Sequence, residues 1–180
     1  QASVEVPFAG VLKLENKHLV IDSEGNGIVL SRNCEIVIED AQGREKSRHH
    51  VPYGTKILAA EGSKVKKGQK VAEWDPFTIP VISEKAGQAE LVDLINNVSV
   101  KETVDETTGI VSKVVVDWRS NSSSAGLKPS IMLKDAKGKP VTYDNGKEVR
   151  YYLSVDAILT VDNGAEVKVG DVIARIPRES

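Results

Sequence analysis

The segment 57–74, "ILAAEGSKVKKGQKVAEW", overlays without a gap on the segment 159–176, "LTVDNGAEVKVGDVIARI". The overlay pairs Gly62 with Gly164 and Gly68 with Gly170, so two glycines recur at one spacing. In both copies an aliphatic residue followed by alanine closes the pattern. Because glycine adopts positive φ at low steric cost, this spacing is typical of short strands joined by tight turns.

Two further overlays extend the repeat. "EIVIEDAQGR" (35–44) matches "SIMLKDAKGK" (130–139), and "VPFAGVLKL" (6–14) matches "SEKAGQAEL" (83–91). Three segments recur in one order, which predicts a duplicated unit rather than a solenoid of many repeats. We expect two tandem domains, 1–77 and 78–180, with a short insertion near "VTYDNGKEVR" in the second.

The local hydrophobic pattern is that of strands. In "NCEIVIED" the alternation places Cys34, Ile36 and Ile38 on one face and the intervening residues on the other. "SIMLKD" repeats this with Ile131 and Leu133 inward, and the turn sequences "DAQGR" and "DAKGK" follow. No segment predicts a helix of ten or more residues, so the sequence indicates an all-β barrel or sandwich.

Composition limits the classes of function. The 180 residues are 40% hydrophobic and 28% charged, with a net charge of -2, which gives no general attraction to nucleic acid or an anionic membrane. No apolar run is long enough to span a bilayer, and "QASVEVPFAG" lacks the features of a signal peptide. We therefore expect a soluble protein, and the single cysteine, which cannot form an internal disulfide, indicates a reducing cytosolic setting.

Metal and thiol chemistry have little support in the sequence. His49 and His50 adjoin each other on an expected strand and point to opposite faces, while His18 lies far away. With one cysteine, Cys34, nothing resembles a zinc ligand set, and its aliphatic neighbours indicate a buried structural thiol. We expect no bound metal and no cofactor.

A basic cluster flanks the first glycine hairpin, formed by Lys64, Lys66, Lys67 and Lys70. Such a cluster could contact the phosphates of DNA. Against this, aromatic stacking platforms are missing, and the corresponding turn of the second copy has Glu166 and Asp171. A solvated charged face is the alternative.

Aromatic residues are the second class of candidate contact. Trp118 and either Tyr151 or Tyr152 could anchor a partner, because aromatic side chains concentrate at the energetic centres of interfaces. Placement of the same residues in the core is the alternative.

The repeated glycine pattern resembles the half-unit of the barrel-sandwich hybrid fold, which biotinyl and lipoyl carrier domains use. The resemblance implies two tandem barrel-sandwich hybrid domains. In a carrier, the modified lysine lies about eleven residues before the glycine equivalent to Gly87, where this chain has Pro76. A carrier or adaptor domain without its cofactor lysine is therefore the alternative function.

The string "WDPFTIPVISEKAG" (74–87) resembles the largest catalytic subunit, beta prime, of bacterial RNA polymerase. "SRN", "VPYG", "DETTG" and the terminal "ARIPRES" are similar to the insertion that interrupts that subunit's trigger loop in proteobacteria. The resemblance runs in order from about Val4 to Ser180.

The resemblance implies a non-catalytic insertion that tunes nucleotide addition, pausing and transcript cleavage by biasing trigger-loop folding. The family's magnesium-binding aspartates and trigger-helix residues do not occur in this chain, so no catalytic residue is carried over. The implied partners are the remaining polymerase subunits (alpha, beta, omega and sigma) and downstream DNA, with magnesium and zinc held elsewhere in the parent enzyme. The implied location is the bacterial cytoplasm, in association with the nucleoid, and we expect the isolated fragment to be monomeric.

Overall fold

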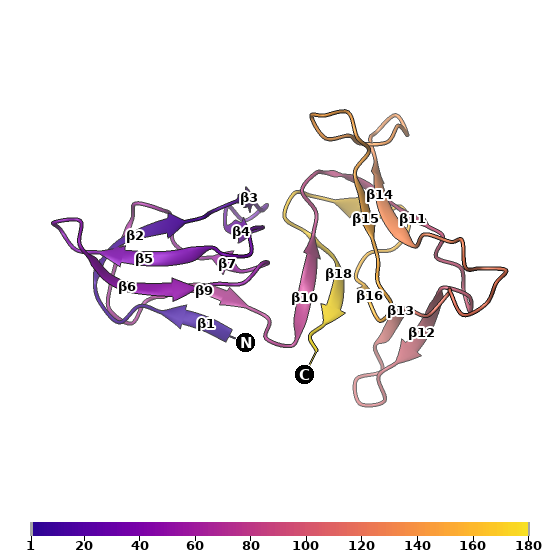
Figure 1. Cartoon of the computed structure of the whole chain (residues 1–180), viewed down its shortest axis with the longest axis horizontal. Coiled ribbons are helices and arrows are strands. Elements are labelled where there is room, and N and C mark those ends of the chain that lie inside the picture. The colour runs from indigo at the N-terminus through magenta and orange to yellow at the C-terminus, as the bar shows by residue number, and fades with distance from the viewer. Residues whose placement is uncertain (1, 180) are drawn as a thin grey trace. The chain divides into compact units, whose positions relative to one another are not determined.

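A computed structural model describes residues 2–179, which form strands and turns and contain no helix (Figure 1). The all-β prediction is confirmed. The chain divides into two compact units, Gln1–Ile79 and Pro80–Ser180. That each half is an independent domain of the barrel-sandwich hybrid type remains a prediction.

The first unit contains two sheets. One has five strands in the order β1-β9-β7-β4-β3, and the other has four in the order β6-β5-β2-β8. Their bounds are β1 (Ala2–Glu5), β2 (Gly10–Glu15), β3 (Leu19–Ile21), β4 (Gly27–Val29), β5 (Glu35–Glu39), β6 (Glu45–His50), β7 (Lys56–Ile57), β8 (Lys64–Val65) and β9 (Lys70–Trp74).

The second unit repeats this arrangement strand for strand. Its sheets have the orders β10-β18-β16-β13-β12 and β15-β14-β11-β17. The bounds are β10 (Thr78–Ile82), β11 (Gly87–Val92), β12 (Val100–Val104), β13 (Val111–Val115), β14 (Ser130–Lys134), β15 (Arg150–Tyr152), β16 (Ile158–Leu159), β17 (Glu166–Val167) and β18 (Val172–Pro177).

Equivalent backbone hydrogen bonds confirm the repeat read from the sequence. The Gly62 amide donates to the Leu12 carbonyl at 2.7 Å, and the Gly164 amide donates to the Ala89 carbonyl at 2.7 Å. Gly62 and Gly164 adopt φ of 86° and 87°, and the second glycine of each hairpin is also positive. The paired glycines therefore form the same two turns in each copy, as the spacing predicts.

The second unit carries three additions that the first lacks (Figure 1). Its β12–β13 hairpin is longer than β3–β4, and residues 116–129 replace the short link 30–34. Residues 135–149 replace the turn 40–44 and include a bridge between Thr142 and Glu148. This third addition is the one that the sequence overlay predicts; the other two were missed.

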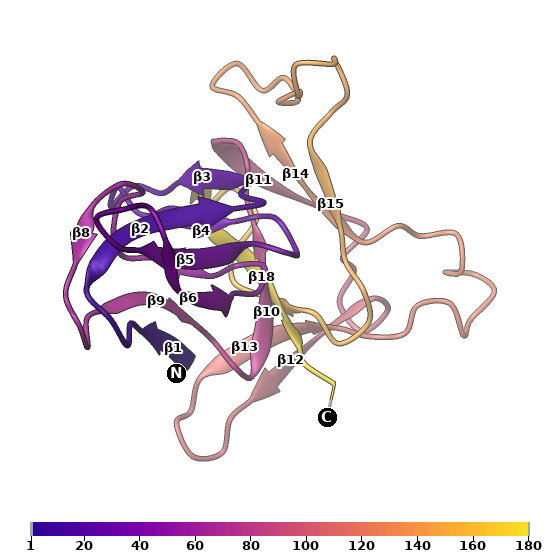
Figure 2. The same ribbon diagram turned by 60° about the vertical axis from the view of Figure 1, so that its left-hand side comes forward.

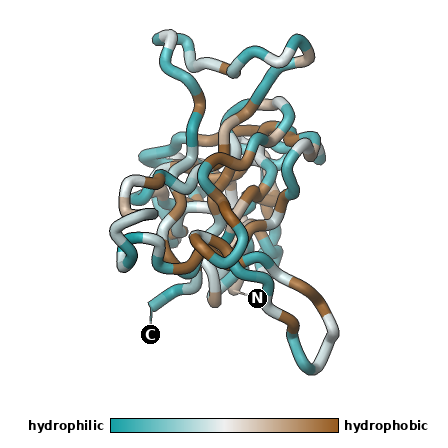
Figure 3. Tube along the Cα trace, turned by 90° about the vertical axis from the view of Figure 1, so that its right-hand side faces the viewer, coloured by the Kyte–Doolittle hydropathy of each residue, from teal (hydrophilic) through white to brown (hydrophobic). Residues whose placement is uncertain are grey.

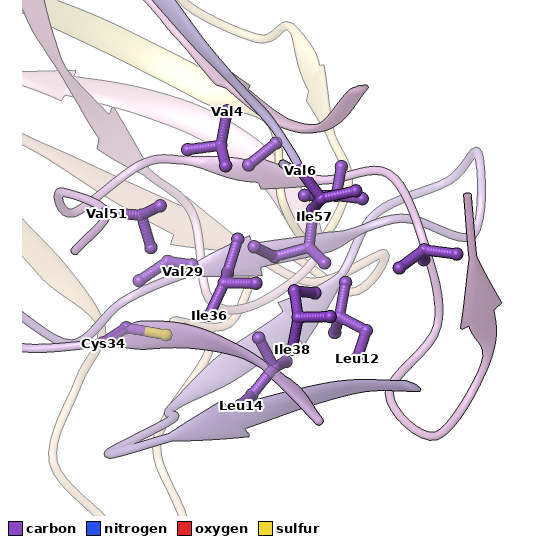
Figure 4. Close-up of a cluster of buried hydrophobic side chains, with 13 residues drawn as sticks. Val4, Val6, Leu12, Leu14, Val29, Cys34, Ile36, Ile38, Val51 and Ile57 are labelled. Carbon is purple, nitrogen blue, oxygen red and sulfur yellow. The ribbon is translucent and has the colours of Figure 1, made fainter. Parts of the chain in front are cut away.

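Each unit has its own hydrophobic core. In the first unit Cys34, Ile36 and Ile38 are buried together among valines and leucines, as Figure 4 shows. Ile131 and Leu133 hold the equivalent place in the second core. The inward faces predicted by alternation are confirmed.

On the opposite face of β5 and of β14, one apolar residue is also buried. The alternation of apolar and polar residues did not predict this. Val37 is 2% exposed, and its cross-strand neighbours are Lys13 and Arg48. Long cationic side chains cover apolar surface with their aliphatic stems while their charged ends stay in water. In the second unit Met132 is buried beside Arg150, whose Nη2 lies 2.8 Å from the methionine sulfur.

Candidate contact surfaces

The four predicted contact lysines gather around β8 and the turn that follows it. Lys64 begins β8, Lys70 begins β9, and Lys66 and Lys67 lie in the turn between these strands (Figure 2). All four are exposed, and we call them the lysine turn. Lys70 forms an ion pair with Glu73 at 2.9 Å, which leaves the other three outside any ion pair within residues 2–179.

The equivalent turn of the second unit has the same backbone and a different charge. The Lys66 amide donates to the side-chain oxygen of Gln69 at 3.0 Å, and the Lys168 amide donates to Asp171 at 2.8 Å. The same hydrogen bond forms in both copies, but its acceptor is the neutral Gln69 side chain in the first and the Asp171 carboxylate in the second. The concentrated positive charge therefore belongs to the first unit.

The predicted aromatic candidates divide between core and surface. Trp118 is 4% exposed and belongs to the second core. Tyr151 is half-buried, and its hydroxyl accepts a hydrogen bond from the Glu84 amide at 2.9 Å. Tyr152 is 65% exposed, so of these three aromatic residues it is the one whose ring is open to a partner.

Trp118 and Tyr152 line one pocket of about 300 Å³ in the second unit. We call this the Trp118 pocket, and its residues are Trp118, Arg119, Leu127, Lys128, Pro129, Tyr152 and Leu153. The Arg119 guanidinium lies 4.7 Å from the Trp118 ring centre, and that of Arg150 lies 5.7 Å from the Tyr152 ring centre. The lining contains two cationic residues and no acidic one.

The added loop 116–129 holds this pocket by hydrogen bonds. Asp117 accepts from the Arg119 amide at 2.9 Å, and the Ser124 hydroxyl donates to the Trp118 carbonyl at 2.8 Å. Asp93 accepts from the Lys128 amide at 2.8 Å, so the backbone is fixed while that side chain stays exposed. Sequence reasoning missed Arg119 and Lys128, because nothing in the spacing shows that this loop brings them to Tyr152.

An apolar groove of about 400 Å³ lies in the first unit. Leu19, Ile21 and Ile57 line it, and the ion pair between Lys17 and Glu61 stands at its edge. The hydrogen bond from Lys17, together with one from a backbone amide, holds the pKa of Glu61 below its usual value. Nothing in the sequence signalled this groove.

A cluster of charges spans three strands on the outside of the β6-β5-β2 sheet. Arg48 contacts Glu15 and Glu45 at 2.6 Å and Glu35 at 3.2 Å. The hydrogen bond from Arg48 lowers the pKa of Glu15, and the hydrogen bonds to Glu15 and Glu45 raise the pKa of Arg48. Three carboxylates share one guanidinium, so the cluster holds the strands together and remains negative.

The cysteine and the histidines form no reactive set. Burial raises the pKa of the Cys34 thiol and lowers the pKa of His49, so both favour their neutral forms. Within residues 2–179 no group of three or more His, Cys, Asp or Glu side chains is arranged to hold a metal ion. No helix in the same range is long and apolar enough to cross a membrane.

The position where a carrier domain would hold its lysine is a closed corner. The Asp75 carboxylate accepts from the Phe77 amide at 2.7 Å and from the Thr78 hydroxyl at 2.6 Å. Pro76 lies between them and fixes its own φ. The corner is stabilised by its own side chains, and Phe77 is 77% exposed beside it.

Comparison with known proteins aligns the chain with one segment of longer polypeptides. No protein-family model matches it. It is 48% identical over 179 residues to the DNA-directed RNA polymerase subunit beta' of Rickettsia canadensis (strain McKiel), and 47% identical to those of Rickettsia akari (strain Hartford) and Rickettsia prowazekii (strain Madrid E).

Each alignment covers 99% of this chain, and the chain spans 13% of the length of these curated relatives. The resemblance to the beta prime subunit is confirmed by this identity. Over nearly its whole length, the chain is homologous to one segment of the beta' subunit of DNA-directed RNA polymerase.

Proposed function

We propose that this chain is a non-catalytic insertion of the polymerase beta' subunit that modulates folding of the trigger loop, and through it nucleotide addition, pausing and transcript cleavage. The observation that carries the proposal is the extent of the alignment, which covers 99% of this chain but 13% of the length of its relative. A segment that has its own two cores is suited to insertion into a larger subunit.

The proposed mechanism is a shift in a conformational equilibrium. A domain attached to a moving loop changes the loop's folding equilibrium only if its contacts with the rest of the enzyme differ between the two states. The exposed groups described above are available for such contacts, and catalysis itself is left to the remainder of the parent subunit. The remaining polymerase subunits, in the bacterial cytoplasm and at the nucleoid, are the partners that this proposal implies.

The test removes the segment equivalent to residues 4–176 from the complete beta' subunit and joins the ends with a short glycine-serine linker. We expect the assembled enzyme to extend RNA while pause lifetime and transcript cleavage rate change. Subunit assembly, checked by gel filtration, is the control. An assembled enzyme that pauses and cleaves as before would remove the regulatory role, and one unable to add nucleotides would contradict the non-catalytic role.

The lysine turn is the surface that we propose for contact with downstream DNA. Four exposed lysines lie in one short region, and three of them are outside any ion pair within residues 2–179. Replacing Lys64, Lys66 and Lys67 by glutamine in the complete polymerase should weaken DNA retention and reduce its salt dependence. Equivalent changes at Lys137, Lys139 and Lys147 of the second unit serve as the charge-matched control. Equal effects from both sets would contradict a specific contact.

A further inference from the structure

We propose that the Trp118 pocket binds an acidic segment of a partner protein, in which a carboxylate lies next to an aliphatic side chain. The proposal is separate from trigger-loop modulation and from the lysine turn. It rests on three properties of the pocket: its shape, an unpaired buried donor and its charge.

The shape suits one or two side chains. The pocket has a volume of about 300 Å³, and Leu127, Pro129 and Leu153 give it apolar walls. Pro129 and Leu153 are buried, so these walls belong to the packed body of the unit. Apolar walls with a few placed polar groups are the usual composition of a ligand pocket.

The unpaired donor is the indole N–H of Trp118. Its Nε1 is buried and has no hydrogen-bond acceptor among residues 2–179. Burying a polar group without a partner is unfavourable, so an acceptor that reaches this N–H when the ligand binds gains more than it would at a solvated site. A carboxylate oxygen is such an acceptor.

The charge comes from guanidinium and ammonium groups held at the pocket. Arg119, a lining residue, lies over the Trp118 ring, and Arg150, which is outside the lining, lies over the ring of Tyr152. Stacking restricts a guanidinium before the ligand arrives, which lowers the entropy lost on binding. Lys128 adds a flexible ammonium on a backbone already anchored to Asp93.

The same features favour a peptide over a nucleic acid. Single-stranded nucleic acid needs several open aromatic faces along an extended basic groove, whereas this pocket has one exposed ring, that of Tyr152, and the Trp118 ring is buried. The second unit, Pro80–Ser180, contains fifteen acidic and thirteen basic residues, so it offers no field for a polyanion. The first copy has His50 at the position of Tyr152 and lacks the added loop, so the pocket belongs to the second copy alone among residues 2–179.

The test uses the two tryptophans of the 180-residue chain. In a proton–nitrogen NMR spectrum of labelled protein, Trp118 reports on the pocket and Trp74 is the internal reference. The probes are capped tetrapeptides alternating Asp or Glu with Leu, Ile, Val or Phe in every combination, at millimolar concentration. Lysine-containing counterparts and octathymidylate are the comparison probes.

We expect acidic peptides to shift the Trp118 indole signal and to leave the Trp74 signal unchanged. Their affinity for the Arg119→Glu variant should be about tenfold lower than for the unaltered protein, because the variant loses a charge-assisted contact. Lys137→Glu, an exposed charge reversal in the same unit, should leave affinity within about twofold, because a distant exposed charge is screened. The amide spectrum of each variant checks its fold.

Three outcomes would overturn the proposal. The first is a Trp118 signal that no acidic peptide moves. The second is a response to octathymidylate alone, which would assign the pocket to nucleic acid. The third is an equal loss of affinity in Arg119→Glu and Lys137→Glu, which would show that peptide binding depends on the net charge of the protein and not on this pocket.

Discussion

Two glycines mark the places where strands approach too closely for any side chain. A Cβ at Gly10 would lie 2.4 Å from the Glu39 carbonyl oxygen, and one at Gly87 would lie 2.8 Å from that of Lys134. Both obstacles are backbone atoms, so the strands themselves would have to separate. We expect Gly10→Ala and Gly87→Ala each to lower the free energy of unfolding by about 1–3 kcal/mol, measured by urea titration.

Gly126 provides the matched control for this prediction, because a Cβ there meets no atom within 4 Å. Gly126→Ala should change the free energy of unfolding by no more than about 0.5 kcal/mol. Equal stability of Gly10→Ala and the unaltered protein would show that β2 and β5 can move apart freely.

Burial of Cys34 predicts a dependence of stability on alkaline pH. Its folded pKa is raised above the unfolded value of roughly 8.5, so its contribution is complete below that pH. The contribution is lost as pH rises toward the folded pKa, because the unfolded thiol ionises first. The urea midpoint of the unaltered protein should therefore fall more between about pH 8 and pH 10 than that of Cys34→Ala.

Parallel slopes for the two proteins would contradict this account of Cys34. Tyr143, whose pKa is also raised by burial, is present in both proteins, so the difference between them isolates the thiol.

At the scale of residues, alternation predicted the inward positions and failed where side-chain length matters. Ile36 and Ile131 lie in the cores as expected. Val37 is buried between its cross-strand neighbours Lys13 and Arg48, and a pattern that sorts residues into polar and apolar does not describe a long cationic side chain that is apolar for most of its length. The Trp118 pocket is beyond such reasoning, since its cations come from different ends of an added loop.

At the scale of elements, the charge cluster around Arg48 links β2, β5 and β6. The pKa of Glu15 is lowered, so its contribution to stability is present above the unfolded pKa of about 4.3 and is lost as pH falls through the folded value. Arg48→Gln should lower the urea midpoint at neutral pH and should flatten its decline between about pH 5 and pH 3. Added salt should reduce the difference between the two proteins.

Lys67→Gln is the matched control for the Arg48 prediction, since it removes one positive charge from an exposed turn and breaks no ion pair within residues 2–179. An equal change in acid dependence from both variants would indicate an effect of net charge rather than of the cluster.

Turns were predicted better than strands at this scale. Positive φ at Gly62 and Gly164 is dictated locally, so the sequence shows it directly. β7 and β8 have two residues each, and their pairing depends on distant strands. The longer β12–β13 hairpin and the loop 116–129 are additions of the second copy, so overlaying the sequence on itself could not place them.

At the scale of the whole molecule, each unit should fold alone. The first core draws on residues 4–74 and the second on residues 81–176, so neither needs side chains from the other. We expect fragments 1–77 and 78–180 each to give a dispersed amide NMR spectrum and a cooperative urea transition. This division keeps β10 with its sheet.

A fragment that unfolds alone and folds only when mixed with the other would contradict the prediction of two domains. The 180-residue chain, measured under the same conditions, supplies the reference stability.

The second copy also shows where chain can be added to this fold. Two of its three additions enter between β13 and β14 and between β14 and β15, and the sheet orders on either side are unchanged from the first copy. The exposed positions of the equivalent links in the first copy, 32–33 and 41–44, are thus natural sites for grafting a lanthanide-binding peptide or a fluorescent label. A reporter placed there would let the domain be followed by resonance energy transfer while an intact polymerase transcribes.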